Sequence, residues 1–270
     1  MTGRTDRMEW TSHDLDDLKN AVGLLENPGL IAKVSDVVGT PVEYVLKTLP
    51  KGAGDKITKV THDSLMAAVN LAVKTIDPRG SSKPRSRSHQ ALAGLAGGVG
   101  GAFGLIALPI ELPITTTVIM RSIADIARSE GEDLTELAPR LACLEVFAMG
   151  SPSDEDDAAE SGYFAVRTAL AQAVSEATKY LTKRAIVEDG GPVIVRLLAQ
   201  IAARFNTVVG EKIMAQGVPI VGALGGATIN VLFIEHFQDM ARGHFVVRRL
   251  ERKYGEVEVR RAYSEIISHR

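Results

Sequence analysis

The class of fold is decided by residues 97–134, which read GGVGGAFGLIALPIELPITTTVIMRSIADIARSEGEDL. The first part of this stretch is built from glycine and small apolar residues, and the second part repeats apolar residues at helical spacing. On a helix that begins near Glu111, five polar residues fall on one narrow stripe; they are Glu111, Thr115, Ser122, Asp125 and Ser129. The stretch therefore predicts a helix that is mostly apolar apart from this stripe.

The rest of the chain follows the same helical pattern. Alternating runs of β-branched and aromatic residues are scarce, and aromatic residues make up only 5% of the chain, so a sheet has little to build on. The sequence predicts an all-α, multi-helix bundle of roughly eight to eleven helices in one domain, residues 1–270, with two glycine-rich central helical segments. Besides the helix near Glu111 and a short one entered through Thr40 and Pro41, the predicted helices are 55–76, 135–149, 160–188, 193–209, 219–253 and 256–268.

Charge and cysteine content narrow the class of protein. The chain has 31 Lys and Arg residues against 33 Asp and Glu residues, so no overall field attracts nucleic acid and no nucleic-acid partner is expected. The single cysteine, Cys143, excludes an internal disulfide, and its apolar neighbours predict a small hydrophobe. The N-terminus is charged from its fourth residue and lacks the apolar stretch of a secretory signal. These features predict a cytoplasmic protein in a reducing compartment.

Two polar segments predict loops between helices. Residues 77–88 (DPRGSSKPRSRS) are rich in proline, glycine and serine, and their basic residues are Arg79, Lys83, Arg85 and Arg87. This basic loop is either a solvated linker or a contact for a phosphate or lipid head group. Residues 150–160 (GSPSDEDDAAE) form an acidic loop without the ligand spacing of a calcium site, so we expect it to lie in solvent.

Two segments, which we call the charge-free segments, carry no Lys, Arg, Asp or Glu: residues 88–110 and residues 213–234. Each is long enough to cross a bilayer as a helix, but glycine adds little apolar area and lowers helix propensity. Small residues at three- and four-residue spacing instead favour closely crossing helices; they include Gly94, Gly97, Gly101, Gly104, Gly222, Gly225 and Gly226. Three interpretations remain open: a hairpin buried in a soluble bundle, a hairpin that reversibly enters or lies on a membrane, and permanent transmembrane helices.

Few polar residues point to catalysis. The carboxylates of Glu111 and Asp125 would hold a metal, activate a water or bind a polar head group. In an enzyme, His236 from the second half of the chain would be a third member of the site. The competing interpretation is an ion pair within the helix, because Arg121 precedes Asp125 by four residues and Arg128 follows it by three. The sequence contains no zinc, nucleotide or hydrolase motif. No metal and no cofactor is therefore expected.

Asn230 lies among apolar residues of the second charge-free segment. A buried amide needs hydrogen-bond partners. We therefore expect Asn230 to join the two charge-free segments.

Two stretches resemble the signatures of a known family. Residues 97–134 resemble the central signature of the EcsC family, in which a glycine-rich segment precedes an acidic residue and a proline, here Glu111 and Pro113. Residues 218–230 (VPIVGALGGATIN) are similar to the second signature of that family, a Val-Pro followed by small residues and an asparagine. The resemblance implies a bacterial helical protein and brings no catalytic residues with it. It directs attention to the glycines and to Glu111, Pro113, Asp125 and Asn230.

These features together predict a non-enzymatic, cytoplasmic helical protein that is peripheral at the inner membrane. It would bind membrane lipid, an apolar ligand or a membrane-protein partner through the glycine-rich hairpins, with the basic loop beside them. Two alternatives remain open. One is a hydrolase or metal-dependent enzyme that uses the carboxylates of Glu111 and Asp125, and the other is a structural module that assembles as a homo-oligomer.

Overall fold

The computed structural model describes residues 9–26, 30, 53–72, 108–150, 162–183, 191–216 and 222–269. Within these residues the chain forms helices and no strand, so the predicted all-α class is confirmed. The elements are α1 (Ser12–Leu25), α4 (Ala53–Asn70), α6 (Leu108–Ser129), α7 (Leu137–Glu145), the 3-10 helix η3 (Val146–Ala148), α8 (Gly162–Lys183), α9 (Pro192–Gln216), α10 (Gly222–Tyr254) and α11 (Glu256–Ser268).

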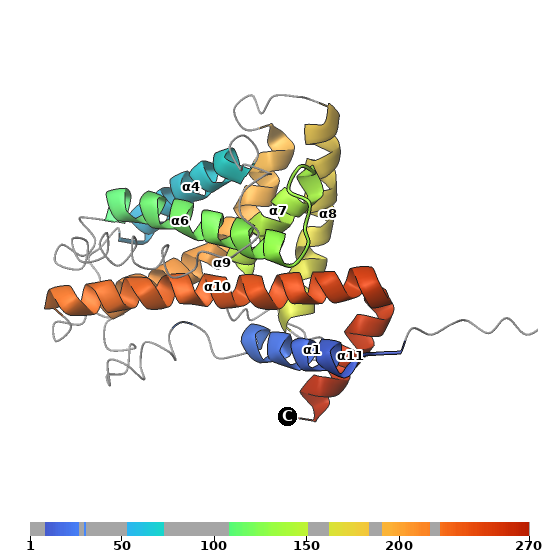
Figure 1. Cartoon of the computed structure of the whole chain (residues 1–270). Coiled ribbons are helices and arrows are strands. Elements are labelled where there is room, and N and C mark those ends of the chain that lie inside the picture. The colour runs from blue at the N-terminus through green and yellow to red at the C-terminus, as the bar shows by residue number, and fades with distance from the viewer. Residues whose placement is uncertain are drawn as a thin grey trace, which may run out of the picture.

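The longest helix, α10, is the central element of the bundle. It contacts α1, α6, α9 and α11 along its length, and Figure 1 shows it crossing the whole molecule. Helix α6 runs beside α10 in the same direction, since Ser122 of α6 lies opposite Gln238 and the later Glu130 lies opposite Arg249. Helices α4 and α9 pack together on one side of α6, and α8 packs against α7 and α9.

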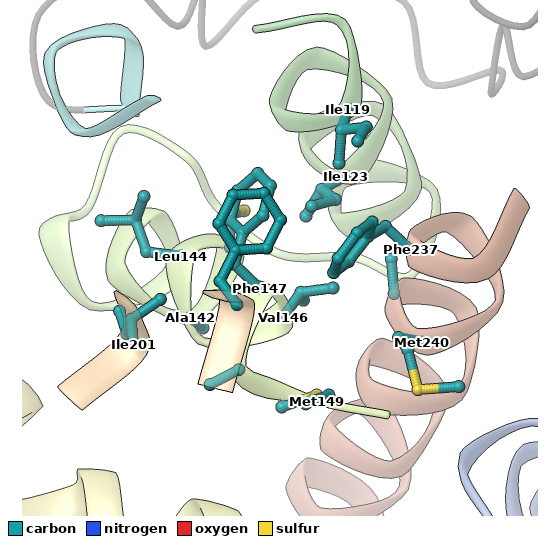
Figure 2. Close-up of a cluster of buried hydrophobic side chains, with 14 of the residues drawn as sticks. Ile119, Ile123, Ala142, Leu144, Val146, Phe147, Met149, Ile201, Phe237 and Met240 are labelled. Atoms are coloured by element: carbon teal, nitrogen blue, oxygen red, sulfur yellow. The ribbon is translucent and has the colours of Figure 1, made fainter. Parts of the chain in front are cut away.

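The core lies between α6, η3, α9 and α10. Four phenylalanines form its centre, with ring centroids 5.1 Å apart for Phe147 and Phe205, 5.4 Å for Phe147 and Phe237, and 5.2 Å for Phe233 and Phe237. Figure 2 shows side chains of α6, η3 and α10 converging on Phe147 and Phe237. Such tilted aromatic pairs contribute about 0.5–1.5 kcal/mol each beyond their buried area.

Helix α9 is longer than the sequence predicts. The predicted helix 193–209 ends before Gly210, because glycine costs up to about 1 kcal/mol inside a helix. The structure continues α9 through Gly210 to Gln216. Residues 211–215 are all buried, so their packing outweighs the cost of one glycine, and the predicted end is wrong.

Other predicted helix bounds agree within a few residues where they fall on described residues. The short helix expected after Thr40 and Pro41 lies outside the described residues. The predicted helix 256–268 is confirmed at both ends. The predicted helix 135–149 is α7 followed by η3, and the predicted helix 55–76 begins as α4 and changes to a π-turn at Leu71 and Ala72.

Several predicted features fall outside the described residues. These are the basic loop 77–88 with Arg79, Lys83, Arg85 and Arg87, nearly all of the acidic loop 150–160, and the first glycine-rich stretch with Gly97, Gly101 and Gly104. Gly222, Gly225 and Gly226 belong to the first turns of α10, but the packing around them is likewise not described. The predicted close crossing of helices at these glycines therefore stays a prediction.

A glycine that the sequence analysis did not single out lies at a close helix contact. Gly243 of α10 is buried and faces α1. A methyl group at this position would lie 2.5 Å from Cγ and 2.9 Å from Cδ2 of Leu25. Carbon atoms essentially never approach this closely, so a methyl group at position 243 would force the buried side chain of Leu25 to move.

Gly243→Ala should lower the free energy of unfolding by about 1–3 kcal/mol, because the added methyl group overpacks the contact with Leu25. The matched control is Gly210→Ala in α9, where a methyl group meets no described atom within 4 Å. That change should raise stability by up to about 1 kcal/mol through helix propensity alone. Urea unfolding of both variants measures whether each change raises or lowers the free energy of unfolding. A stabilised Gly243→Ala protein would contradict the close contact.

Candidate functional site

A lysine, a glutamate and an asparagine form a buried polar triad. Lys212 Nζ donates hydrogen bonds to Glu111 Oε1 at 2.7 Å and to Asn230 Oδ1 at 2.8 Å. The side chains of Lys212 and Glu111 are 0% and 3% exposed, and Asn230 is fully buried. The ammonium group also lies 4.6 Å from the ring centroid of Phe233. We call this group the Lys212 triad.

Three helices bring the members of the triad together. Glu111 is in the first turn of α6, where the exposed amides of a helix start favour a carboxylate. Lys212 lies about one turn before the end of α9, and Asn230 lies two turns inside α10. Each of the three helices contributes one member, so the triad connects α6, α9 and α10 through hydrogen bonds between buried side chains.

Burial has a clear electrostatic consequence at Lys212. Loss of solvent lowers the pKa of the Lys212 ammonium group, and the neighbouring Glu111 carboxylate acts in the opposite direction. Three further buried oxygens at the start of α6, Glu111 Oε2, Thr115 Oγ1 and Thr116 Oγ1, have no hydrogen-bond partner within the described part of the chain. Of these three atoms, Glu111 Oε2 belongs to the carboxylate that binds Lys212, and the charge of that carboxylate favours the ammonium form of the lysine.

The triad lies at the borders of the two charge-free segments in the sequence. Glu111 is the first charged residue after residues 88–110, and Lys212 is the last one before residues 213–234. Their pairing joins both segments to one end of the molecule, which we call the charge-free end. Figure 1 shows the starts of α6 and α10 on the same side of the molecule, away from α11.

Among the residues of the second charge-free segment whose burial is described, 213–215 and 227–234, the majority are buried. This segment does not form one helix, since it is divided between the end of α9 and the start of α10. Residues 213–215 are buried in α9, and Ile229, Phe233 and Ile234 are buried in α10. Among the described residues, one helix is long and apolar enough to span a membrane, Pro192–Ala215, and 44% of its most apolar 18-residue window is buried in the bundle. Length and composition alone are weak evidence for a span.

The three residues considered for catalysis do not come together. Asp125 Oδ1 accepts a hydrogen bond from Arg128 at 2.5 Å, as the ion-pair interpretation of the α6 stripe expects. Glu111 and Asp125 are 14 residues apart on α6, which places them about 21 Å apart along its axis. His236 is buried beside Phe237, with their ring centroids 5.1 Å apart. Within the described residues no three ligand-type side chains gather around a metal position.

Lys212 is the member of the triad that sequence reasoning missed. The sequence analysis used Lys212 only to mark the start of a charge-free segment. On a helix, however, Lys212 lies on the same face as the apolar residues Val208 and Val209. A lysine on the apolar face of a helix is the signal that would have found it.

A second buried polar cluster lies at the other end of α10. The hydroxyl of Tyr163 on α8 is 3.0 Å from Nδ1 of His244, and Arg167 donates to both carboxylate oxygens of Glu251 at 2.6 and 3.1 Å. Burial lowers the pKa of His244 far below its ordinary value, and the positive charges of Arg167 and Arg248 lower it further. His244 is therefore neutral, and its Nδ1 atom shares a hydrogen bond with the Tyr163 hydroxyl.

Residues 6–250 of the chain match the EcsC protein family, which agrees with the two stretches that resemble its signatures. No curated protein and no solved structure matches the chain.

Lys212→Met should lower the free energy of unfolding by about 3–5 kcal/mol, because it leaves the Glu111 carboxylate buried without its counter-ion. The matched control is Arg242→Met on α10, which removes a partly exposed pair with Asp239 and should cost less than about 1 kcal/mol. Urea unfolding measures both variants. Equal losses in the two would contradict a buried ion pair at Lys212.

His244 should make the protein less stable in mild acid. Its pKa is lower in the folded chain than in the unfolded chain, so below about pH 6.5 the unfolded chain binds the proton more readily and stability falls with pH. The slope from this residue reaches at most about 1.4 kcal/mol per pH unit.

His244→Asn keeps an acceptor for Tyr163 and removes the titrating group. Urea unfolding of both proteins between about pH 7 and pH 5 should give a steeper fall for the natural chain. Burial raises the pKa of Glu145, and this opposite contribution is present in both proteins, so it cancels in the comparison. Parallel stability curves would show that His244 is not held neutral.

Proposed function

The chain belongs to the EcsC protein family, and from this premise we propose that it is a non-enzymatic, cytoplasmic helical protein that binds the lipid of the inner membrane surface. Contact with lipid is made by the charge-free end of the bundle. The observation that carries the proposal is the hydrogen-bonded pairing of Glu111 with Lys212, since it joins both charge-free segments to one end of the molecule.

Two exposed isoleucines at the charge-free end support a lipid contact. Ile110 and Ile114 are 72% and 49% exposed, and their four-residue spacing puts them side by side on α6. Burying an isoleucine side chain contributes about 1.5–3 kcal/mol when it is fully exposed beforehand. Two such side chains next to an uncharged segment give a weak, reversible membrane contact of the peripheral kind.

The C-terminal end of α10 carries charged side chains that form ion pairs. Arg248 pairs with Glu132, and Arg249 pairs with Glu130 and Asp17. Asn230 and Arg249 are 19 residues apart on one helix, so about 28 Å separates this charged end from the Lys212 triad. These described ion pairs lie at the end of α10 that faces away from Ile110 and Ile114, so the proposed lipid contact is made by the other end.

A membrane protein and a second copy of the chain are the alternative partners, and each predicts a different result with pure lipid vesicles. A membrane-protein helix would be bound only when that protein is present in the bilayer, whereas lipid binding occurs with vesicles of pure lipid. A homo-oligomer that covers Ile110 and Ile114 would remove the exposed apolar area before any membrane contact. Sedimentation of the purified protein separates this last case from the other two.

We expect the purified protein to float with liposomes, and the double variant Ile110→Ser, Ile114→Ser to float at least roughly tenfold less well at the same lipid concentration, since it loses apolar contact area. Val257→Ser is the matched control, because Val257 is 85% exposed on α11, far from the charge-free end. It should float like the natural chain.

The flotation is run with neutral vesicles and with anionic vesicles. Failure of the natural chain to float with either type at low salt contradicts the proposal. Equal flotation of the isoleucine variant and the Val257→Ser control would mean that this part of α6 does not contact lipid.

A further inference from the structure

A cavity of about 260 Å³ lies at the charged end of the bundle, between α8, α10 and α11. Phe164 and Ala171 of α8 form its apolar wall, and the hydroxyl of Thr168 lies between them along the helix. The volume is slightly below the range of drug-sized ligand sites, which begins at about 300 Å³. The cavity therefore suits a small metabolite.

Charges of both signs line this cavity. Arg167 and Arg260 contribute guanidinium groups, and Glu251 and Glu256 contribute carboxylates. A simple anion would meet the two carboxylates, and a simple cation would meet the two guanidinium groups. The lining is complementary to a molecule that carries one charge of each sign.

Arg167 has one edge of its guanidinium group ready for a carboxylate. Its Nη1 and Nη2 atoms donate to Glu251, and Nη1 also donates to the hydroxyl of Tyr163 at 3.4 Å. The remaining edge, formed by Nε and the second Nη2 proton, makes no hydrogen bond within the described part of the chain. The two N–H groups of this edge are parallel, which is the geometry that binds a carboxylate through both oxygens.

The surroundings hold Arg167 in place. Its side chain is 19% exposed and that of Glu251 is 9% exposed, and the guanidinium carbon lies 5.7 Å from the ring centroid of Phe164. Arg260 approaches the same ring at 5.0 Å. A binding group that is already oriented loses little conformational freedom when a ligand arrives.

Glu256 offers the opposite charge. It lies in the first turn of α11 and is exposed, and the ion pair among the described lining residues, Arg167 with Glu251, does not include it. Its carboxylate borders the cavity together with Glu251. An ammonium group in the cavity would therefore find an acceptor that is not already committed to an arginine.

We propose that this cavity binds a small zwitterion of the α-amino acid class. The carboxylate of the ligand is bound by the Nε and Nη2 edge of Arg167, its ammonium group by Glu256, and its side chain by the wall of Phe164 and Ala171. This site is independent of the membrane contact, since it lies at the other end of α10.

Saturation-transfer NMR of the full chain with the twenty standard amino acids tests the proposal. At least one should bind with a dissociation constant below about 1 mM, and titration calorimetry then compares it with its N-acetyl and amide derivatives. Each derivative lacks one of the two charges, so each should bind at least roughly tenfold more weakly, as the loss of one hydrogen-bonded charge predicts.

Two variants on α11 complete the test. Glu256→Gln should weaken binding of the chosen amino acid roughly tenfold, whereas Glu265→Gln, an exposed change outside the cavity, should leave it unchanged. Both positions are exposed, so neither variant endangers folding. The proposal is overturned if none of the twenty amino acids binds, if the derivatives bind as well as the parent compound, or if Glu256→Gln binds like Glu265→Gln.

Discussion

A buried lysine is tolerated only where hydrogen-bond acceptors or an opposite charge pair with its ammonium group. This constraint governs the packing of α6, α9 and α10. The ammonium group of Lys212 is held by Glu111 and Asn230. Moving any of the three helices by one turn would leave a charged or polar group alone in apolar surroundings, which costs several kcal/mol, roughly 3–5 for a broken buried pair. The helices can therefore pack in only one register at this end. That register determines where the chain enters and leaves the charge-free segments.

The two ends of α10 differ because charge is distributed unevenly along it. Its first part belongs to a charge-free segment and supplies Ile229, Phe233 and Ile234 to the core, while its last turns carry Arg248 and Arg249. The arginines are satisfied by carboxylates of α1 and of the connection between α6 and α7. Such partly exposed pairs contribute little singly and more as a network. The proposed membrane contact and the proposed amino-acid cavity then occupy opposite ends, so binding at one leaves the other accessible.

The spacing of apolar residues in the sequence is sufficient to predict helices. It also gives the correct bounds of helix 256–268, because the apolar pattern there is short and begins directly after a glycine. It is not sufficient to predict contacts between helices. A buried amide predicts partners for Asn230, yet the partner Lys212 is 18 positions away and Glu111 is a further 101 positions from Lys212. One sequence gives no means of choosing these residues from all other charges. The close approach at Gly243 was missed for the same reason, since its neighbour Leu25 lies on α1.

The most direct test of the shared register is an exchange of charges in the Lys212 triad. Glu111→Lys and Lys212→Glu are made singly and together, and the free energy of unfolding is measured for all four proteins. Each single change places two like charges in contact, whereas the double change restores an opposite pair, and the Asn230 amide can turn over to donate to a carboxylate at position 212. The account predicts that the double variant recovers at least about 2 kcal/mol relative to the sum of the single losses. Strictly additive losses would show that the two residues do not meet, and would contradict a common attachment point for the charge-free segments.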